Sequence, residues 1–463
     1  MKRKHIQHLY WRAGFGLNNS EISELEKKSK TKIIKNLFKE ANSFEPLKID
    51  LSEYDVLLTK KSGKLIREMG KENVKKLAQK SKREVITLNK AWLDRLYEPS
   101  SVLREKMTLF WANVFVCKDK NIWNIQKYNN TLRANSLGNF RTFVKAVAHE
   151  PSMLNYLNNK QNKKAHPNEN FARELMELFT LGVGNYTEQD IKESARAFTG
   201  WTFKKRGGFF LDKKNHDNGE KTFFGKKGNW NGDDIIDIIL EQQQCARYIC
   251  SRIYTYFINP KIDSERLEKL TEIFYKDYDI EKLMTHIYSS KWFYEEHNIG
   301  VKIKSPIELL VGMYQIVPHT LSNKNQTRYL QTMMGQMLLN PVNVSGWKGG
   351  TAWIDANTMM FRLKLPSVLL NNALINLDEK GDIEGTFEQF YKRTKKRKKF
   401  LQTTTDWKLF ESSYADASNE ILKNDLILSK IHPDTEALLK NLTKTSKKDF
   451  CIQLMSIPEY QLC

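Results

Sequence analysis

The feature that most constrains this 463-residue chain is that its apolar residues recur at helical spacing along most of its length. Clear examples are residues 103–116, 140–157, 171–181, 191–198 and 235–253. Glycine and proline, which are frequent in turn-rich β folds, number only 22 and 11. The pattern therefore predicts a mainly α fold, a multi-helical globular array, and argues against a sandwich or barrel.

One stretch departs from the helical period. Within residues 201–225, Gly207 and Gly208 lie between two short runs rich in aromatic residues. A glycine pair in that position is typical of a hairpin turn. We therefore expect one small β-hairpin excursion near residues 201–225, followed by a polar loop over His216–Gly219.

Changes in composition suggest how the chain is organised. A main helical domain is expected over residues 1–385, with a variable basic helical insertion at about 47–90. The run Lys392–Lys399 is basic except for Thr394, which is typical of a solvated linker. Residues 386–463 are thus expected to form a basic linker and a C-terminal helical tail that packs back on the main domain.

The charge balance favours an acidic partner. Lys and Arg number 75 against 54 Asp and Glu, so the net charge is +21. Nucleic acid, anionic lipid headgroups and acidic proteins all attract such a chain, whereas evenly solvated surface lysines would be neutral in function. Nucleic acid ranks below a protein partner, because aromatic residues are not interleaved with the basic runs 59–83 and 392–399.

The sequence predicts a soluble, cytoplasmic protein. The basic start Met1–Ile6 is not followed by an apolar stretch, so no secretory signal is expected. No run reaches the ~18 consecutive apolar residues of a transmembrane helix. The five cysteines are scattered and odd in number, which favours reduced thiols over a disulfide framework.

The most informative segment runs from His166 to Gly200. Pro167 fits the first turn of a helix, whose apolar residues then recur until Gly182 or Gly184, where we expect a left-handed end. Thr187 begins a second helix, with Asp190 three residues later in a capping-box arrangement.

Polar residues form a narrow stripe on the first of these helices. At about 100° per residue, Asn170, Glu174 and Glu177 fall within about 60° of one another. Two interpretations remain open. The three side chains satisfy a neighbouring helix or pair with arginines such as those at positions 133, 141 and 196, or they form a site that binds a divalent cation or transfers protons.

Two loops complete the candidate site. His216 and Asp217 are adjacent in the first, an acid–base or metal-binding pair unless Asp217 only forms a turn. The second loop, Asn343–Trp347, is irregular because of its glycine and anchored by its tryptophan. In the enzyme hypothesis these loops converge on the polar stripe. The roles are catalytic for Glu174, His216 and Asp217, substrate-binding for Asn170, Arg173, Lys221, Asn343 and Trp347, and metal-binding for Glu174, Glu177, His216 and Asp217.

Several common catalytic motifs are missing. The sequence contains no phosphate-binding glycine loop, no His-Glu-x-x-His pair, no Gly-x-Ser-x-Gly elbow and no dinucleotide fingerprint. These absences argue against P-loop nucleotide hydrolysis, zinc proteolysis of that type and dinucleotide chemistry.

Taken together, the segments resemble a bacterial domain-of-unknown-function family, the one numbered eighteen hundred. The most specific match is PNENFARELMELFTLGVGNYTEQDIKESARAFTGW at residues 167–201. Further matching segments lie at residues 8–16, 103–115, 132–157, 216–225, 228–240, 335–362 and 457–460. Residues 47–90 and 373–447 match poorly. The loop before Trp347 departs from the family pattern at positions 342 and 345.

The resemblance implies a largely helical fold and no established reaction. Members of the family are often encoded beside proteins similar to phosphatases and sulfatases, and many relatives are exported. Three hypotheses follow: a hydrolase-like enzyme acting on a polar or anionic substrate, a scaffold or maturation partner of a phosphatase- or sulfatase-like protein, and a nucleic-acid-binding protein.

Overall fold

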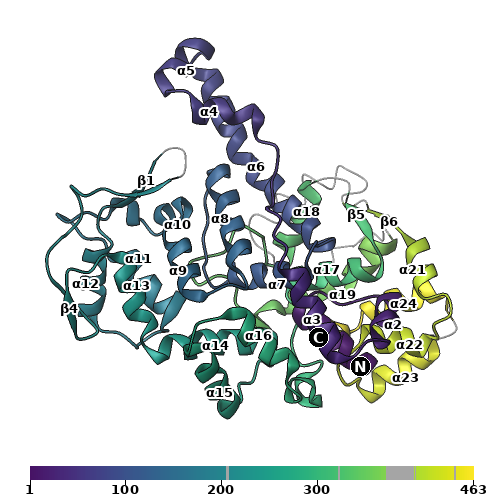
Figure 1. Cartoon of the computed structure of the whole chain (residues 1–463). Coiled ribbons are helices and arrows are strands. Elements are labelled where there is room, and N and C mark those ends of the chain that lie inside the picture. Colours follow the sequence, from purple (N-terminus) through teal and green to yellow (C-terminus); the bar gives the residue numbers. More distant parts are fainter. Residues whose placement is uncertain (205–207, 322–323, 372–400, 402, 443–444) are drawn as a thin grey trace. The chain divides into compact units, whose positions relative to one another are not determined.

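The computed structural model confirms a mainly α fold (Figure 1). It describes the chain except residues 205–207, 322–323, 372–400, 402 and 443–444, so the basic run Lys392–Lys399 lies outside the described residues. Over the described ranges the strands form two-stranded antiparallel sheets only. The same part of the chain contains no helix that is both long and apolar enough to span a membrane.

The chain divides into two compact units. The domain boundary expected near residue 385 lies outside the described residues. Unit 1 contains Met1–Ile33, Tyr294–Met337 and Lys348–Cys463, and unit 2 contains Ile34–Phe293 and Leu338–Trp347. The helix α3 (Lys30–Ala41) crosses from one to the other along the chain.

Unit 2 holds all of the candidate site residues. Its helices are α4 (Asp55–Thr59), α5 (Ser62–Met69), α6 (Lys71–Tyr97), α7 (Val102–Trp111), α8 (Ile122–Asn135), α9 (Phe140–Ala148), α10 (Pro151–Tyr156), α11 (Asn170–Glu174), α12 (Glu188–Ala197), α13 (Gly232–Leu240), α14 (Gln243–Phe257), α15 (Ser264–Tyr275) and α16 (Ile280–Ser289). Within this core, Trp111 stacks with Phe115 at 5.6 Å and meets the edge of Phe143 at 5.2 Å.

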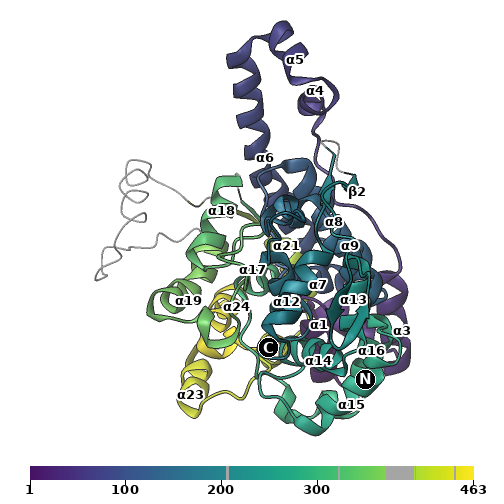
Figure 2. The ribbon, with the colours of Figure 1, turned by 90° about the vertical axis from the view of Figure 1, so that its left-hand side faces the viewer.

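Most of the expected insertion at about 47–90 is helical, whereas its residues 47–51 are not. Residues 55–83 comprise α4, α5 and the N-terminal half of α6, and we call them the arm. In both ribbon views the arm extends away from helices α7 to α14 of the same unit (Figures 1 and 2). The C-terminal half of α6 packs in the core of the unit, where Leu88, Trp92 and Leu96 are buried.

The expected hairpin is present, and a second one follows it. The strands β1 (Trp201–Phe203) and β2 (Phe209–Leu211) pair antiparallel on either side of the glycine pair. The next hairpin joins β3 (Lys221–Phe223) to β4 (Lys226–Gly228). It was not predicted, because its two-residue turn is Phe224-Gly225 rather than the usual Asn-Gly, although both residues have positive φ.

Unit 1 is built around α1 (Arg3–Ala13), α17 (Pro306–Ile316) and the C-terminal helices. Its other helices are α2 (Asn19–Glu26), α18 (Lys324–Met333), α19 (Ala356–Asn371), α21 (Trp407–Ser413), α22 (Asn419–Leu426), α23 (Pro433–Leu442) and α24 (Lys447–Met455). A short sheet pairs β5 (His319–Leu321) with β6 (Thr403–Thr405). The chain's last segments therefore belong to the same core as its first helix.

A buried ion pair lies at the centre of unit 2. Glu105 on α7 and Arg133 on α8 are 2% and 0% exposed, and their side chains make two hydrogen bonds of 2.6 and 3.1 Å. Replacing Glu105 with glutamine leaves the buried guanidinium without its counter-charge. We expect Glu105→Gln to lower the free energy of unfolding by about 3–5 kcal/mol, measured by urea denaturation.

The matched control for this prediction is Asp237→Asn. Asp237 pairs with Arg141 and Lys145, but its side chain is 35% exposed. This change should cost no more than about 1 kcal/mol. If Glu105→Gln costs as little as the control, the buried pair is not the stabilising contact described here.

His319 makes the stability of unit 1 depend on pH. Burial lowers its pKa from 6.5 to about 4, so the unfolded chain binds this proton at higher pH than the folded chain does. The free energy of unfolding should therefore fall as the pH falls from about 6.5 to about 4, by roughly 3 kcal/mol at most. Thermal unfolding across this range should show a shallower pH dependence for His319→Gln, and equal slopes would contradict the prediction.

Candidate functional site

The helix that carries the polar stripe changes its geometry halfway along. The α-helix α11 ends at Glu174 and continues as a π-helix over Leu175–Thr180. Carbonyl groups of this wider turn accept hydrogen bonds from two side-chain hydroxyls, Thr180 to Leu175 (2.6 Å) and Tyr248 to Leu178 (3.0 Å). The expectation of one regular helix with a 100° period is therefore wrong beyond Glu174. π-turns inside helices are frequent at functional sites.

The caps around this helix are as expected. Gly182 and Gly184 follow it with φ of 83° and 80°. Thr187 and Asp190 form a capping box at the start of α12, which confirms the predicted second helix. Gly200 then takes a φ of 76°, and a Cβ atom there would lie 2.5 Å from the carbonyl oxygen of Asp212.

Among the titratable groups of the stripe, Glu174 is the one whose charge is least balanced by partners. Its side chain is half-buried and makes no hydrogen bond or ion pair within the described part of the chain. Burial raises the pKa of this carboxyl, and the neighbouring charge of Glu177 raises it further. Only Arg173 acts in the opposite direction.

Two tyrosines lie near the carboxylates. The hydroxyl of Tyr186 donates a hydrogen bond of 2.8 Å to Glu177, and burial with this carboxylate raises the pKa of Tyr186 to about 12. The pKa of Tyr156 is raised by burial and then by Cys117 and Glu174. Both phenols are therefore protonated near neutral pH, as hydrogen-bond donors.

The three arginines expected as possible partners of the stripe bind other carboxylates. Arg133 binds Glu105 at 2.6 Å, Arg141 binds Asp237 at 2.6 Å, and Arg196 binds Asp217 at 2.8 Å and Glu193 at 3.0 Å. Neutralisation of Glu174 by one of these three arginines does not occur.

Arg173 and Asn170 make contacts at the beginnings of helices α11 and α12. The guanidinium of Arg173 binds Glu169 at 3.1 Å and Glu188 at 3.0 Å, and these carboxylates raise its pKa. The backbone amide of Asn170 donates to the side chain of Asn168 (3.0 Å), and its own side chain is exposed. An anionic ligand at Arg173 would have to compete with two carboxylates.

The His216 loop is held in place by its own hydrogen bonds. His216 is 5% exposed, with Nδ1 2.8 Å from the carbonyl oxygen of Thr199. The carboxylate of Asp217 binds Arg196, and this contact helps to lower the pKa of Asp217 against the opposing effect of burial. The ammonium of Lys221, which is 1% exposed, donates to the carbonyls of Asp217 (2.7 Å) and Gly219 (2.9 Å).

The Asn343–Trp347 loop is clamped by one side chain of the core. Asn113 accepts from the backbone amide of Trp347 (2.7 Å) and donates to its carbonyl (3.0 Å). Gly346, with φ of 77°, allows this approach, because a Cβ atom there would lie 2.3 Å from the Asn113 amide oxygen. Trp347 is 5% exposed, as expected for an anchor, while Asn343 is exposed.

The structure thus brings the candidates together in separate groups. Glu177 acts on Glu174, and Lys221 contacts Asp217. Among the described residues, no hydrogen bond or ion pair links residues 170–180, which carry Glu174, to the loop of His216 or to the loop of Asn343. Within the same residues, no group of three or more His, Cys, Asp or Glu side chains is arranged to hold a metal ion.

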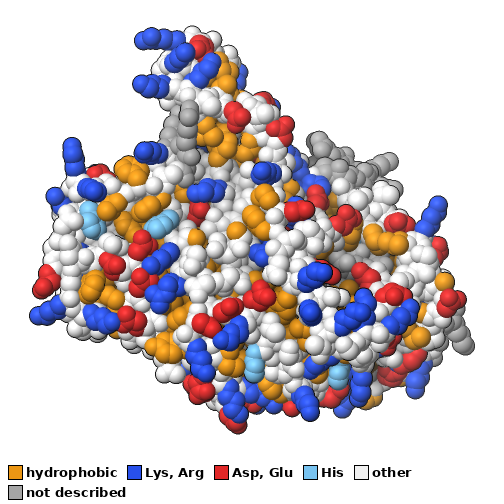
Figure 3. All heavy atoms as spheres, viewed as in Figure 1, with side chains coloured by type: hydrophobic (Ala, Val, Ile, Leu, Met, Phe, Trp, Pro, Cys, Tyr) orange, Lys and Arg blue, Asp and Glu red, His pale blue; other side chains and the backbone are white. Residues whose placement is uncertain are grey.

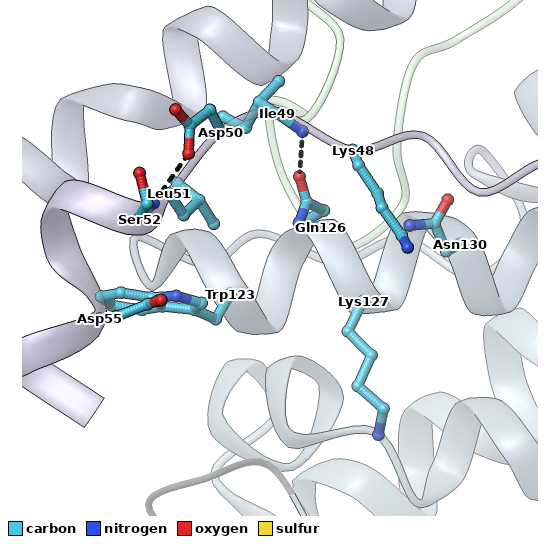
Figure 4. A pocket seen from close by; sticks show the side chains of 10 residues that line it. All are labelled: Lys48, Ile49, Asp50, Leu51, Ser52, Asp55, Trp123, Gln126, Lys127 and Asn130. Atoms are coloured by element: carbon cyan, nitrogen blue, oxygen red, sulfur yellow. Dashed lines mark hydrogen bonds between the residues drawn. The ribbon is translucent and has the colours of Figure 1, made fainter. Parts of the chain in front are cut away.

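A pocket that the sequence did not suggest lies between α8 and the segment that leads to the arm (Figure 4). Its volume is about 550 Å³. Ten residues line it: Lys48, Ile49, Asp50, Leu51, Ser52, Asp55, Trp123, Gln126, Lys127 and Asn130. Amide side chains of α8 hold its outer wall, Asn130 binding the backbone of Leu47 and Gln126 that of Ile49. Neither segment has a recognisable motif, so only their folding together reveals the pocket.

The chain matches one protein family over nearly its whole length. Residues 8–462 match the family described as "Protein of unknown function (DUF1800)". The chain belongs to this family, as its sequence segments suggested. No similar curated protein and no similar solved structure was found.

The pKa of Glu174 provides a direct test of the site. Because the charge of Glu177 raises it, Glu177→Gln should lower the pKa of Glu174 towards its ordinary value of 4.5. Carboxyl ¹³C shifts of labelled glutamate, followed by NMR against pH, would measure the change. The exposed Glu272 provides the control, since Glu272→Gln should leave this titration unchanged. An unshifted Glu174 in the Glu177 variant would show that the two carboxylates do not interact.

Proposed function

We propose that this protein is a hydrolase-like enzyme in which Glu174 transfers a proton. The observation that carries the proposal is the half-buried carboxyl of Glu174, whose pKa is raised and which no cation neutralises among the described residues. A raised pKa shifts a carboxyl towards the range in which it can act as a general acid.

The two carboxylates divide the work between them. Glu174, as the acid, donates its proton to the leaving-group oxygen, while Glu177, as the base, accepts a proton from the attacking water. Water adds across the cleaved bond, and solvent returns the proton from Glu177 to Glu174. Tyr186, which donates to Glu177, holds that carboxylate in position. No step requires a metal, although a divalent ion was one of the expectations for this stripe.

The substrate is proposed to be polar and the compartment cytoplasmic. Arg173 and Lys221 are occupied by carboxylates and backbone carbonyls, so a bound anion has less support than a neutral polar group. All five cysteines are free and buried, which suits a reducing compartment. His216 and Asp217 support the fold of the neighbouring loop in this proposal and are not the primary catalysts.

The test is a screen of chromogenic esters, phosphates, sulfates and glycosides with the purified full chain. We expect one class to be hydrolysed, and Glu174→Gln to reduce kcat by about 10²–10⁴-fold because glutamine cannot donate the proton. The activity should also decline as the pH rises through the pKa of Glu174. Metal content, measured on the same samples by elemental analysis, reports whether an ion accompanies the activity.

Two controls accompany this screen. Glu272→Gln should retain full activity, and the Glu174 variant should unfold at or above the temperature of the parent. A Glu174→Gln protein that is folded and fully active would overturn the proposal, as would a complete lack of hydrolysis in all four classes.

A non-enzymatic role is the second candidate. The net charge of +21 favours binding to an acidic protein, such as a phosphatase- or sulfatase-like enzyme that this chain would scaffold or mature. Co-purification of such a partner at low salt, unaffected by Glu174→Gln, would favour this role over catalysis.

A further inference from the structure

The arm is a part of unit 2 that carries a large excess of positive charge. Its 29 residues include ten Lys and Arg against three Asp and Glu, a net charge of +7. Ion pairs of the arm within the described chain involve two of these cations, Lys60 with Glu68 and Lys80 with Glu53. The other eight are exposed and unpaired there: Lys61, Lys64, Arg67, Lys71, Lys75, Lys76, Lys82 and Arg83.

The outer end of the arm combines this charge with exposed apolar side chains. On α5, Leu65 is buried against the arm, while Ile66 and Met69 are 40% and 36% exposed. Gly70, with φ of 80°, turns the chain directly into α6, so that Lys71 follows Met69 closely. In the space-filling view, orange apolar patches lie among the blue basic side chains of the arm (Figure 3).

We propose that the arm is a membrane-binding device that docks end-on to an anionic lipid surface. Lipid phosphates would bind the basic residues around α5, chiefly Lys64, Arg67 and Lys71, while Ile66 and Met69 enter the headgroup region. Buried apolar area and electrostatic attraction to anionic lipids together set the strength of interfacial binding. This interaction is independent of the chemistry proposed for Glu174.

The composition of the arm favours lipid over nucleic acid. No Phe, Tyr or Trp occurs in residues 55–83, so the arm offers no platform for stacking bases. A duplex contacted through its phosphates would pair with the cations but would leave Ile66 and Met69 exposed, unless they wedge between base steps. A lipid interface accommodates both kinds of side chain.

The experiment is co-sedimentation of the full chain with large vesicles of phosphatidylcholine, with or without about 30 mol% phosphatidylglycerol, a content in the range that lends a surface its negative potential. We expect binding to the anionic vesicles only, weakening as salt is added because the charges are exposed. At about 1 kcal/mol per cation, roughly fivefold each, the triple variant Lys64→Glu, Arg67→Glu, Lys71→Glu should bind at least about 100-fold more weakly. The double variant Ile66→Ser, Met69→Ser should also bind more weakly.

The matched control reverses three exposed lysines elsewhere in unit 2, with Lys227→Glu, Lys261→Glu and Lys276→Glu. It alters the net charge by the same amount, so it should retain most of the binding if the arm is the docking site. Equal losses in the two triple variants, or equal binding to neutral vesicles, would overturn the proposal.

A second ligand distinguishes lipid from nucleic acid. A 20-base-pair DNA duplex should bind more weakly than the anionic vesicles at the same salt concentration. Tighter binding to the duplex, lost in the arm triple variant but unchanged in the serine variant, would overturn the lipid assignment in favour of a nucleic-acid surface. Thermal unfolding at the parent temperature establishes that each variant is folded.

Discussion

The buried pair of Glu105 and Arg133 is the contact on which the rest of unit 2 depends. Arg133 also donates to the side chains of Asn129 and Asn130, each at 2.8 Å. Asn130 in turn binds the backbone of Leu47 through both of its amide atoms. One desolvated guanidinium therefore fixes α7 against α8 and also fixes the segment that begins the pocket and leads to the arm.

The candidate site also depends on buried polar groups that find partners, but here these groups belong to the backbone. Side chains satisfy carbonyl and amide groups that irregular segments leave unpaired, as Thr180 and Tyr248 do for the π-helix and Asn113 does for the Trp347 loop. Buried polar backbone without partners would be costly. These contacts make non-helical geometry stable where the candidate residues lie.

Features that depend on local patterns could be predicted from the sequence. The helical class, the capping box at Thr187, the left-handed glycines and the hairpin around Gly208 all follow from residue spacing or from the conformations that glycine allows. The π-turn after Glu174 was missed because it depends on hydroxyl donors, of which Tyr248 is distant in sequence. The Arg196–Asp217 pair and the pocket beside Trp123 were missed because they form between segments that carry no motif.

The distribution of compensated and uncompensated charge connects the two proposals. Arg133, Arg196 and Lys221 are buried or partly buried, and each has an acidic or carbonyl partner, so their charges are explained by stability alone. Glu174 and eight cations of the arm have no such partner in the described chain. Leaving Glu174 half-buried beside another carboxylate lowers the stability of the fold. Crowding like charges along the arm lowers it as well. Folding gains nothing from either arrangement, whereas proton transfer and binding to an anionic surface each require one of them.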